Sequence, residues 1–116
     1  MRTLGLALVT AFGLFAGPAR AHAILVDSTP AIDARVGAGD VALRLRFNSR
    51  VDRGRSRLTL IRADKSPVVL PILPDGSDDI LRSHVALAPG VYIVRWQVLA
   101  IDGHITRGDV PLTVTP

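Results

Sequence analysis

The clearest strand pattern in this chain is Val41-Ala42-Leu43-Arg44-Leu45-Arg46-Phe47-Asn48, in which large apolar residues alternate with small or polar ones. Side chains two residues apart point to the same face of a strand. One face of this stretch is therefore expected to join a core, while the face that carries Arg44 and Arg46 meets water. After residue 22 this alternation recurs, and no helical period competes with it.

Six further segments have the character of strands, and Gly, Pro and Asp residues separate them. Pro71 marks one of them as a sheet edge, because proline cannot donate to a ladder of hydrogen bonds. Short strands joined by such turns favour a sandwich over a barrel. We predict an all-β fold, a seven-stranded antiparallel Greek-key β-sandwich of immunoglobulin-like or cupredoxin-like form. The six segments are residues 23–26, 57–62, 68–73, 81–87, 91–99 and 106–114.

Residues 1–21 are predicted to be a cleavable signal peptide. Arg2 gives a positive start, an apolar run extends from Leu4 to Phe15, and Ala19-Arg20-Ala21 is a small-x-small cleavage signal. The apolar run is too short to span a bilayer, which takes about 20 residues. Residues 22–116 then form a single exported domain.

Composition excludes several classes of function. The chain of 116 residues has no cysteine, so disulfides and thiolate metal sites are absent. The net charge is +4, but Arg2 and Arg20 leave with the signal peptide. The one arginine cluster, within residues 50–57, has no neighbouring aromatic residues and is interpreted as a solvated loop or strand edge. We expect a monomer that does not bind nucleic acid.

His22 becomes the first residue of the mature chain if cleavage follows Ala21. The α-amine and the ring Nδ1 of an N-terminal histidine can hold one metal ion together. Because the amine has a pKa near 8, a metal displaces its proton easily at neutral pH. Alternatively, cleavage simply leaves a histidine at this position without a role.

Asp102-Gly103-His104 lies between the last two expected strands. In an extended segment the carboxylate and the imidazole, two residues apart, converge on one point. Asp-Gly is also a turn signal, so a plain hairpin with a surface histidine is the alternative. Combined with His22 these groups make three nitrogens and one oxygen, a set that suits Cu(II) or Ni(II). His84 lies on the polar face of its strand, and we interpret it as a surface residue.

Four stretches match the pattern of one known family. They are His22-Ala23-Ile24-Leu25 with Ser28-Thr29-Pro30-Ala31, then Leu43-Arg44-Leu45-Arg46-Phe47, then Gly90-Val91-Tyr92-Ile93-Val94-Arg95-Trp96-Gln97-Val98, and finally Asp102-Gly103-His104. In this combination the chain resembles the CopC family of periplasmic copper-binding proteins. The resemblance covers essentially the whole mature chain.

The resemblance implies one Cu(II) per chain, bound by His22 through amine and ring and by Asp102 and His104. It also implies a role in copper resistance or homeostasis, and a CopD-type inner-membrane copper transporter as partner. Some members hold Cu(I) in a Met-rich loop that corresponds to residues 65–79, where this chain has no methionine. Some members carry a glutamate shortly after the middle strand, near the Cu(II) site, where this chain has Asn48, Ser49 and Arg50.

Two other functions remain open at this point. A metal-free immunoglobulin-like interaction module would need only the sandwich. An oxidative copper enzyme would use an N-terminal histidine chelate, as in enzymes that cleave polysaccharides, but a carboxylate ligand favours Cu(II) over Cu(I). No catalytic residues can be assigned by the ordinary rules of nucleophile and base, so we do not expect an enzyme.

Overall fold

The computed structural model describes residues 23–116, so the expected signal peptide and His22 lie outside it. Apart from a 3-10 helix, η2 (Arg53–Arg55), the described residues form strands and turns. No helix among them is long and apolar enough to cross a membrane. The strands are β1 (Leu25–Thr29), β2 (Ala34–Gly37), β3 (Gly39–Phe47), β4 (Arg57–Ile61), β5 (Pro67–Leu70), β6 (Ile80–Leu87), β7 (Gly90–Leu99) and β8 (Ile105–Thr115).

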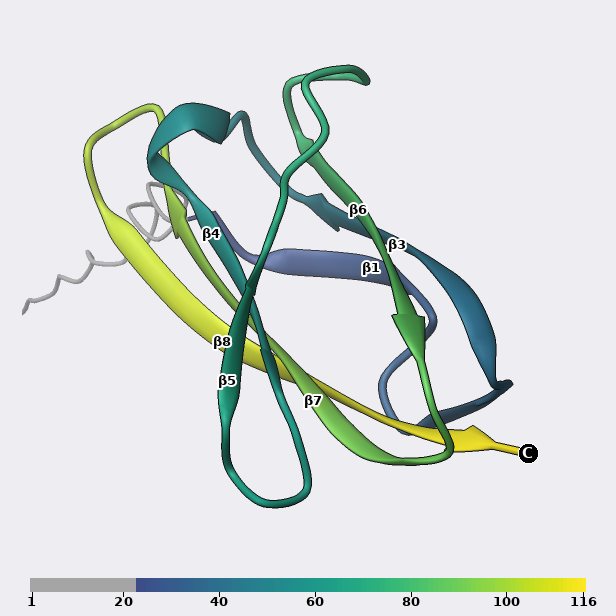
Figure 1. Ribbon diagram of the computed structural model, residues 1–116. Coiled ribbons are helices and arrows are strands. Elements are labelled where there is room, and N and C mark those ends of the chain that lie inside the picture. Colours follow the sequence, from purple (N-terminus) through teal and green to yellow (C-terminus); the bar gives the residue numbers. More distant parts are fainter. Residues whose placement is uncertain (1–22) are drawn as a thin grey trace, which may run out of the picture.

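These strands form two sheets that face each other as a sandwich (Figure 1). One sheet has the order β1-β3-β6 and the other has the order β2-β8-β7-β4-β5. The predicted β-sandwich is confirmed. Its largest antiparallel pairing, between β7 and β8, runs from Gly90 opposite Val114 to Leu99 opposite Ile105.

The strand count differs from the prediction, since the described residues contain eight strands instead of seven. The additional strand is β2, which pairs in parallel with β8, whereas only antiparallel pairs were expected. β2 has four residues, and two of them, Arg35 and Gly37, are exposed. So short a stretch carries little periodicity, and its pairing is decided by the path of the chain between the sheets.

Most strand ends differ from the predicted ones by one to three residues, and β1 and β5 are two examples. β1 begins at Leu25, later than predicted, because the N–H of Ile24 bonds to the Asn48 side chain instead of joining the ladder. β5 ends at Leu70, directly before Pro71, and it is the outermost strand of its sheet. The prediction of an edge was therefore correct although the strand is shorter.

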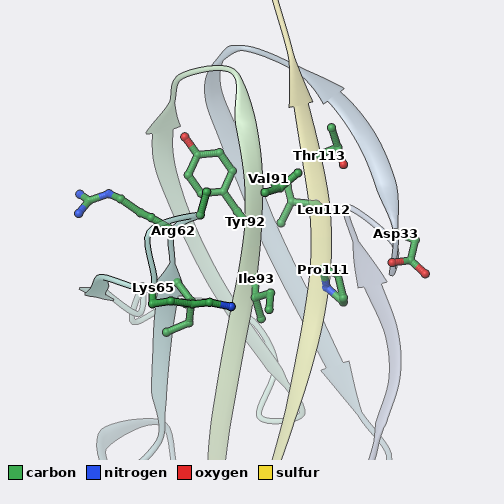
Figure 2. Close-up of a pocket in the computed structure, with 11 residues that line it drawn as sticks. Asp33, Arg62, Lys65, Val91, Tyr92, Ile93, Pro111, Leu112 and Thr113 are labelled. Carbon is green, nitrogen blue, oxygen red and sulfur yellow. The ribbon is translucent and has the colours of Figure 1, made fainter.

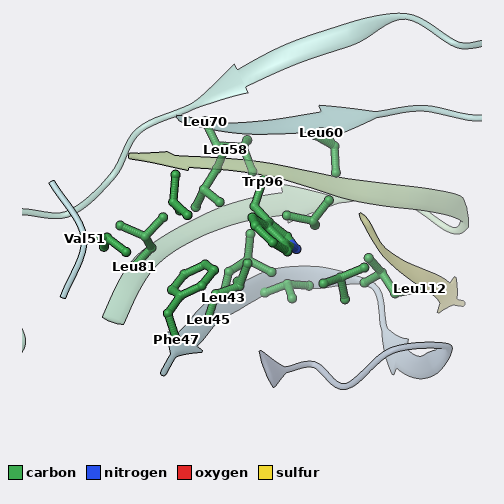
Figure 3. Packing of buried hydrophobic residues seen from close by; sticks show 14 of the residues in the cluster. Leu43, Leu45, Phe47, Val51, Leu58, Leu60, Leu70, Leu81, Trp96 and Leu112 are labelled. Carbon is green, nitrogen blue, oxygen red and sulfur yellow. The ribbon is translucent and has the colours of Figure 1, made fainter. Parts of the chain in front are cut away.

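The core lies between the sheets and follows the predicted alternation (Figure 3). On β3 the buried side chains are Val41, Leu43, Leu45 and Phe47. Trp96 of β7 packs its ring edge-on to that of Phe47, with centroids 5.2 Å apart, a favourable aromatic geometry. The arginines between these positions face outward, as the pattern requires. The further buried apolar residues of the cluster include Leu58, Leu60, Leu70, Leu81, Val94, Val98, Val110, Leu112 and Val114.

Arg53 ties the β5–β6 loop to the rest of the sandwich. Its guanidinium donates hydrogen bonds to the carbonyls of Pro74, Gly76, Ser77 and Ile80, at 2.9 to 3.4 Å. Pro74, Gly76 and Ser77 lie in the loop, where no strand ladder pairs their carbonyls, and Ile80 is the first residue of β6. Arg53 therefore acts as a cross-link between η2 and the loop.

We expect Arg53→Ala to lower the free energy of unfolding by about 2 kcal/mol, because hydrogen bonds from a charged donor contribute about 1.5–3 kcal/mol. Urea denaturation measures this change. The matched control is Arg55→Ala. The Arg55 side chain is 77% exposed, and its Nε makes a long ion-pair contact of 3.8 Å with Asp52 Oδ2. Surface ion pairs of this kind contribute about 0–1 kcal/mol. Equal effects of the two substitutions would contradict the cross-link.

Candidate functional site

The β7–β8 hairpin turns through residues 100–104. The N–H of Ala100 donates to His104 O at 2.8 Å, and the N–H of Gly103 donates to Ala100 O at 2.9 Å. Gly103 has a φ of +91°, in the left-handed region that favours glycine. This glycine lets the chain reverse within a few residues and sets Asp102 and His104 on the same turn.

Asp102 and His104 are in direct contact. One carboxylate oxygen of Asp102 accepts from the backbone N–H of His104, and the other lies against its ring Nδ1, each at 3.0 Å. The imidazole is 57% exposed and the carboxylate 28%. When Nδ1 carries the proton and donates to the carboxylate, the lone pair of the imidazole resides on Nε2, the atom that can ligate a metal. The two side chains therefore meet as predicted, although through a hairpin turn and not through the extended segment on which the prediction rested.

The start of the described chain runs beside this hairpin. Ala23 is fully buried, and its carbonyl accepts a hydrogen bond from Thr106 Oγ1 at 2.7 Å. Thr106 lies only two residues after His104. The next residue, Ile24, donates to Asn48 Oδ1 at 2.8 Å and accepts from Asn48 N at 3.0 Å. Ala23 and Ile24, the two residues that follow His22 in the sequence, are thus hydrogen-bonded at the same end of the sandwich as Asp102 and His104.

His22 itself lies outside the described residues, so its place in the predicted ligand set stays a prediction. Among residues 23–116, no group of three or more His, Cys, Asp or Glu side chains is arranged to hold a metal ion. His84 is exposed on β6, opposite Ala42, and belongs to the outer face of the small sheet. Its interpretation as a surface residue agrees with this position.

Thr106 and Asn48 were not recognised as site residues from the sequence. Each carries a short polar side chain next to a strand end, a pattern that occurs in many turns. From the sequence, Asn48 only marks the region where some CopC members carry a glutamate. In this fold its amide oxygen accepts a hydrogen bond from the N–H of Ile24, just before β1. Trp96, by contrast, is 7% exposed and packs in the core, as its apolar strand face indicates.

A shallow hollow of about 350 Å³ lies at the other end of the large sheet. It is lined on the outer face by Ile93 and Pro111 and bordered by Lys65 and Asp33 (Figure 2). None of the lining residues belongs to the hairpin turn. The hollow is therefore separate from the Asp102–His104 pair.

Two carboxyl groups have lowered pKa values, that of Asp109 on β8 and that of Asp64 in the β4–β5 turn. Arg95 donates to both carboxylate oxygens of Asp109, at 2.8 and 3.1 Å, and this bonding holds the pKa of Asp109 below its usual range. Hydrogen bonds from Ser66 likewise lower the pKa of Asp64 in the β4–β5 turn. Both groups are engaged in cross-strand or turn contacts and are placed to stabilise structure.

The fold and the hairpin together define a small β-sandwich with a polar pair at one end, next to its first strand. The model of the CopC domain family matches residues 25–115, and the chain belongs to this family. Protein YobA of Escherichia coli strain K12 is 33% identical over 98 residues, which is 81% of this chain and 79% of that protein.

Solved structures agree with this assignment. CopC from Methylosinus trichosporium OB3b superposes with a TM-score of 0.76 at 31% identity, covering 82% of this chain and 95% of that one. PcoC, described as a methionine-rich copper resistance protein from Escherichia coli, gives a TM-score of 0.67 at 25% identity, covering 82% of this chain and all of PcoC.

Proposed function

We propose that this chain is an exported Cu(II)-binding protein that holds one copper ion per chain at the hairpin end of the sandwich. The ligands are His22, through its α-amine and ring, with Asp102 and His104. The observation that carries the proposal is the hydrogen bond between Ala23 O and Thr106 Oγ1. Residue 22 is bonded directly to Ala23, and consecutive Cα atoms lie about 3.8 Å apart, which supports His22 as a ligand beside the Asp102–His104 turn.

The chemistry of the donor set favours Cu(II). Amine and imidazole nitrogens with a carboxylate oxygen suit a tetragonal ion, and copper has the highest affinity in the divalent series. Residues 22–116 contain neither Met nor Cys, so they offer no soft sulfur ligands for Cu(I). The carboxylate favours the oxidised ion, so we propose a binding protein and not an enzyme that cycles copper between oxidation states.

The proposed setting is the periplasm, after removal of residues 1–21. His22 has a free α-amine only after this cleavage, so Cu(II) binding through the amine depends on removal of the signal peptide. We propose that the protein serves copper resistance or homeostasis as a monomer, and that a CopD-type membrane transporter accepts the ion.

The test is a Cu(II) titration of residues 22–116 in competition with a chelator of known strength. We expect one equivalent to bind tightly, and His104→Ala to weaken binding by at least about a hundredfold, because even outer-shell partners contribute about 10–100-fold. His84→Ala is the matched control and should change nothing. Weak binding without a fixed stoichiometry would contradict the proposal and favour a metal-free interaction module.

The contact between Asp102 and His104 allows two roles for the carboxylate, and Asp102→Asn separates them. As a direct ligand, the carboxylate supplies charge and an oxygen donor, so its loss should shift both the visible absorption and the electron spin resonance of bound Cu(II). A carboxylate that only orients the imidazole would leave the spectra unchanged while affinity falls. We propose the first role and expect shifted spectra.

A further inference from the structure

Three isoleucines are exposed around the Asp102–His104 pair. Ile101 and Ile105 flank the pair in the hairpin, and Ile24 lies on the adjoining first segment. Their exposed fractions are 65%, 52% and 52%. Single exposed apolar side chains are normal on a protein surface, but several that gather at one place mark an interaction site.

Two arginines lie next to these isoleucines, and a third lies in the same cross-strand row as one of them. The carbonyl of Arg50 accepts from the N–H of Ile101 at 3.3 Å, and Arg107 follows Ile105 on the same face of β8. Arg57 and Arg107 lie on either side of Gln97 in one cross-strand row. Within residues 23–116, none of these three guanidinium groups forms an ion pair with a carboxylate. This end of the molecule therefore carries uncompensated positive charge beside apolar side chains.

The acidic residues of this end do not cancel that charge. Asp102 contacts the histidine of the hairpin, and Asp52 is paired with an arginine of η2. Asp78 and Asp79 belong to the β5–β6 loop on the other side of residue 51. The N–H of Val51 bonds to Asp78 O, while Val51 itself bridges to residue 100 of the hairpin. The chain around Val51 therefore lies between Asp78 and Asp79 on one side and the hairpin on the other.

We propose that this end of the sandwich, defined by the three isoleucines with Arg50, Arg57 and Arg107, docks onto a bilayer surface that contains anionic phospholipid. Apolar side chains enter the boundary between headgroups and acyl chains, while arginines remain with the lipid phosphates. The β7–β8 hairpin projects at the end of the sandwich beside η2 (Figure 1). Its side chains can therefore enter the headgroup region of a bilayer. The proposal goes beyond metal binding, and it places the Asp102–His104 pair at the membrane.

The test uses metal-free residues 22–116 with chelator present, so its outcome does not depend on the copper proposal. Co-sedimentation is measured with vesicles of 30% phosphatidylglycerol in phosphatidylcholine and with phosphatidylcholine alone. We expect binding only to the anionic vesicles. Raised salt should weaken this binding about tenfold, because salt shortens the Debye length over which the lipid charge attracts the arginines. Ile101→Ser and Arg107→Gln should each weaken binding about fivefold.

Matched controls come from the rest of the large sheet. Val69 is 66% exposed on β5, and Arg62 borders the hollow at the other end, so Val69→Ser and Arg62→Gln should leave vesicle binding unchanged. Absence of binding to anionic vesicles would overturn the proposal and leave an acidic protein surface as the partner of this end. Equal losses in control and test variants would also overturn it, since they would indicate attraction by net charge alone.

Discussion

Adding one glycine before His22 is expected to weaken Cu(II) binding by at least about a hundredfold, more than the outer-shell effects of about 10–100-fold. The added residue converts the α-amine into an amide, whose nitrogen no longer offers a lone pair at neutral pH. It also breaks the chelate between amine and ring, which holds the metal with two atoms of one residue. Chelator competition on the mature and extended proteins measures the ratio.

The extended protein should fold like the mature one. Ala23 keeps its contact with Thr106, and Ile24 keeps both hydrogen bonds with Asn48, because the extension lies before these residues. Thermal unfolding of the metal-free proteins is the control, and we expect equal midpoints. Equal Cu(II) affinity in the two forms would rule out the amine as a ligand.

The second large effect is expected for Gly108→Ala in β8. A Cβ added at Gly108 would lie 2.3 Å from Cζ2 and 2.6 Å from Cε2 of Trp96, the residue directly opposite on β7. The indole is buried and packs edge-on against Phe47, so it cannot move freely to make room. We expect a loss of about 3 kcal/mol in the free energy of unfolding, at the upper end of usual overpacking costs. For a domain of this size that lowers the melting temperature by roughly 12 °C or more.

Gly37→Ala is the matched control, because an added Cβ meets nothing within 4 Å there. Its stability should stay within about 0.5 kcal/mol of the parent. Trp96→Phe in the Gly108→Ala background should recover part of the loss, since it removes the crowded ring. The indole Nε1 has no hydrogen-bond partner among the described residues, so this change breaks no such bond. A stable Gly108→Ala protein would show that the indole can move aside.

Local alternation was enough to predict most strands and the core. On β3 the period of two places every second side chain inside, and the same argument holds for Val94, Trp96 and Val98 on β7. The alternation is visible in neighbouring residues because successive side chains of a strand point to opposite faces, and burial of apolar area favours placing one of these faces inside. The contact between Asp102 and His104 could be predicted because their spacing of two is local, although the turn at Gly103 brings them together and not the period of a strand.

Pairing between strands that are far apart in the sequence could not be predicted from the local pattern of residues. The parallel pairing of β2 with β8 joins residues far apart in sequence, and four residues are too few to reveal it. The bond from Thr106 to Ala23 spans 83 positions of the chain, and the close approach of Gly108 to Trp96 depends on register.

For this protein, the sequence by itself determined the class of fold, the faces of its main strands and the local Asp102–His104 turn. Only the tertiary structure decided that the first segment lies beside that turn, and that exposed isoleucines lie near arginines that form no ion pair within residues 23–116. The physical reason is that periodicity acts between near neighbours, whereas sheet order and register are set by packing of the whole chain.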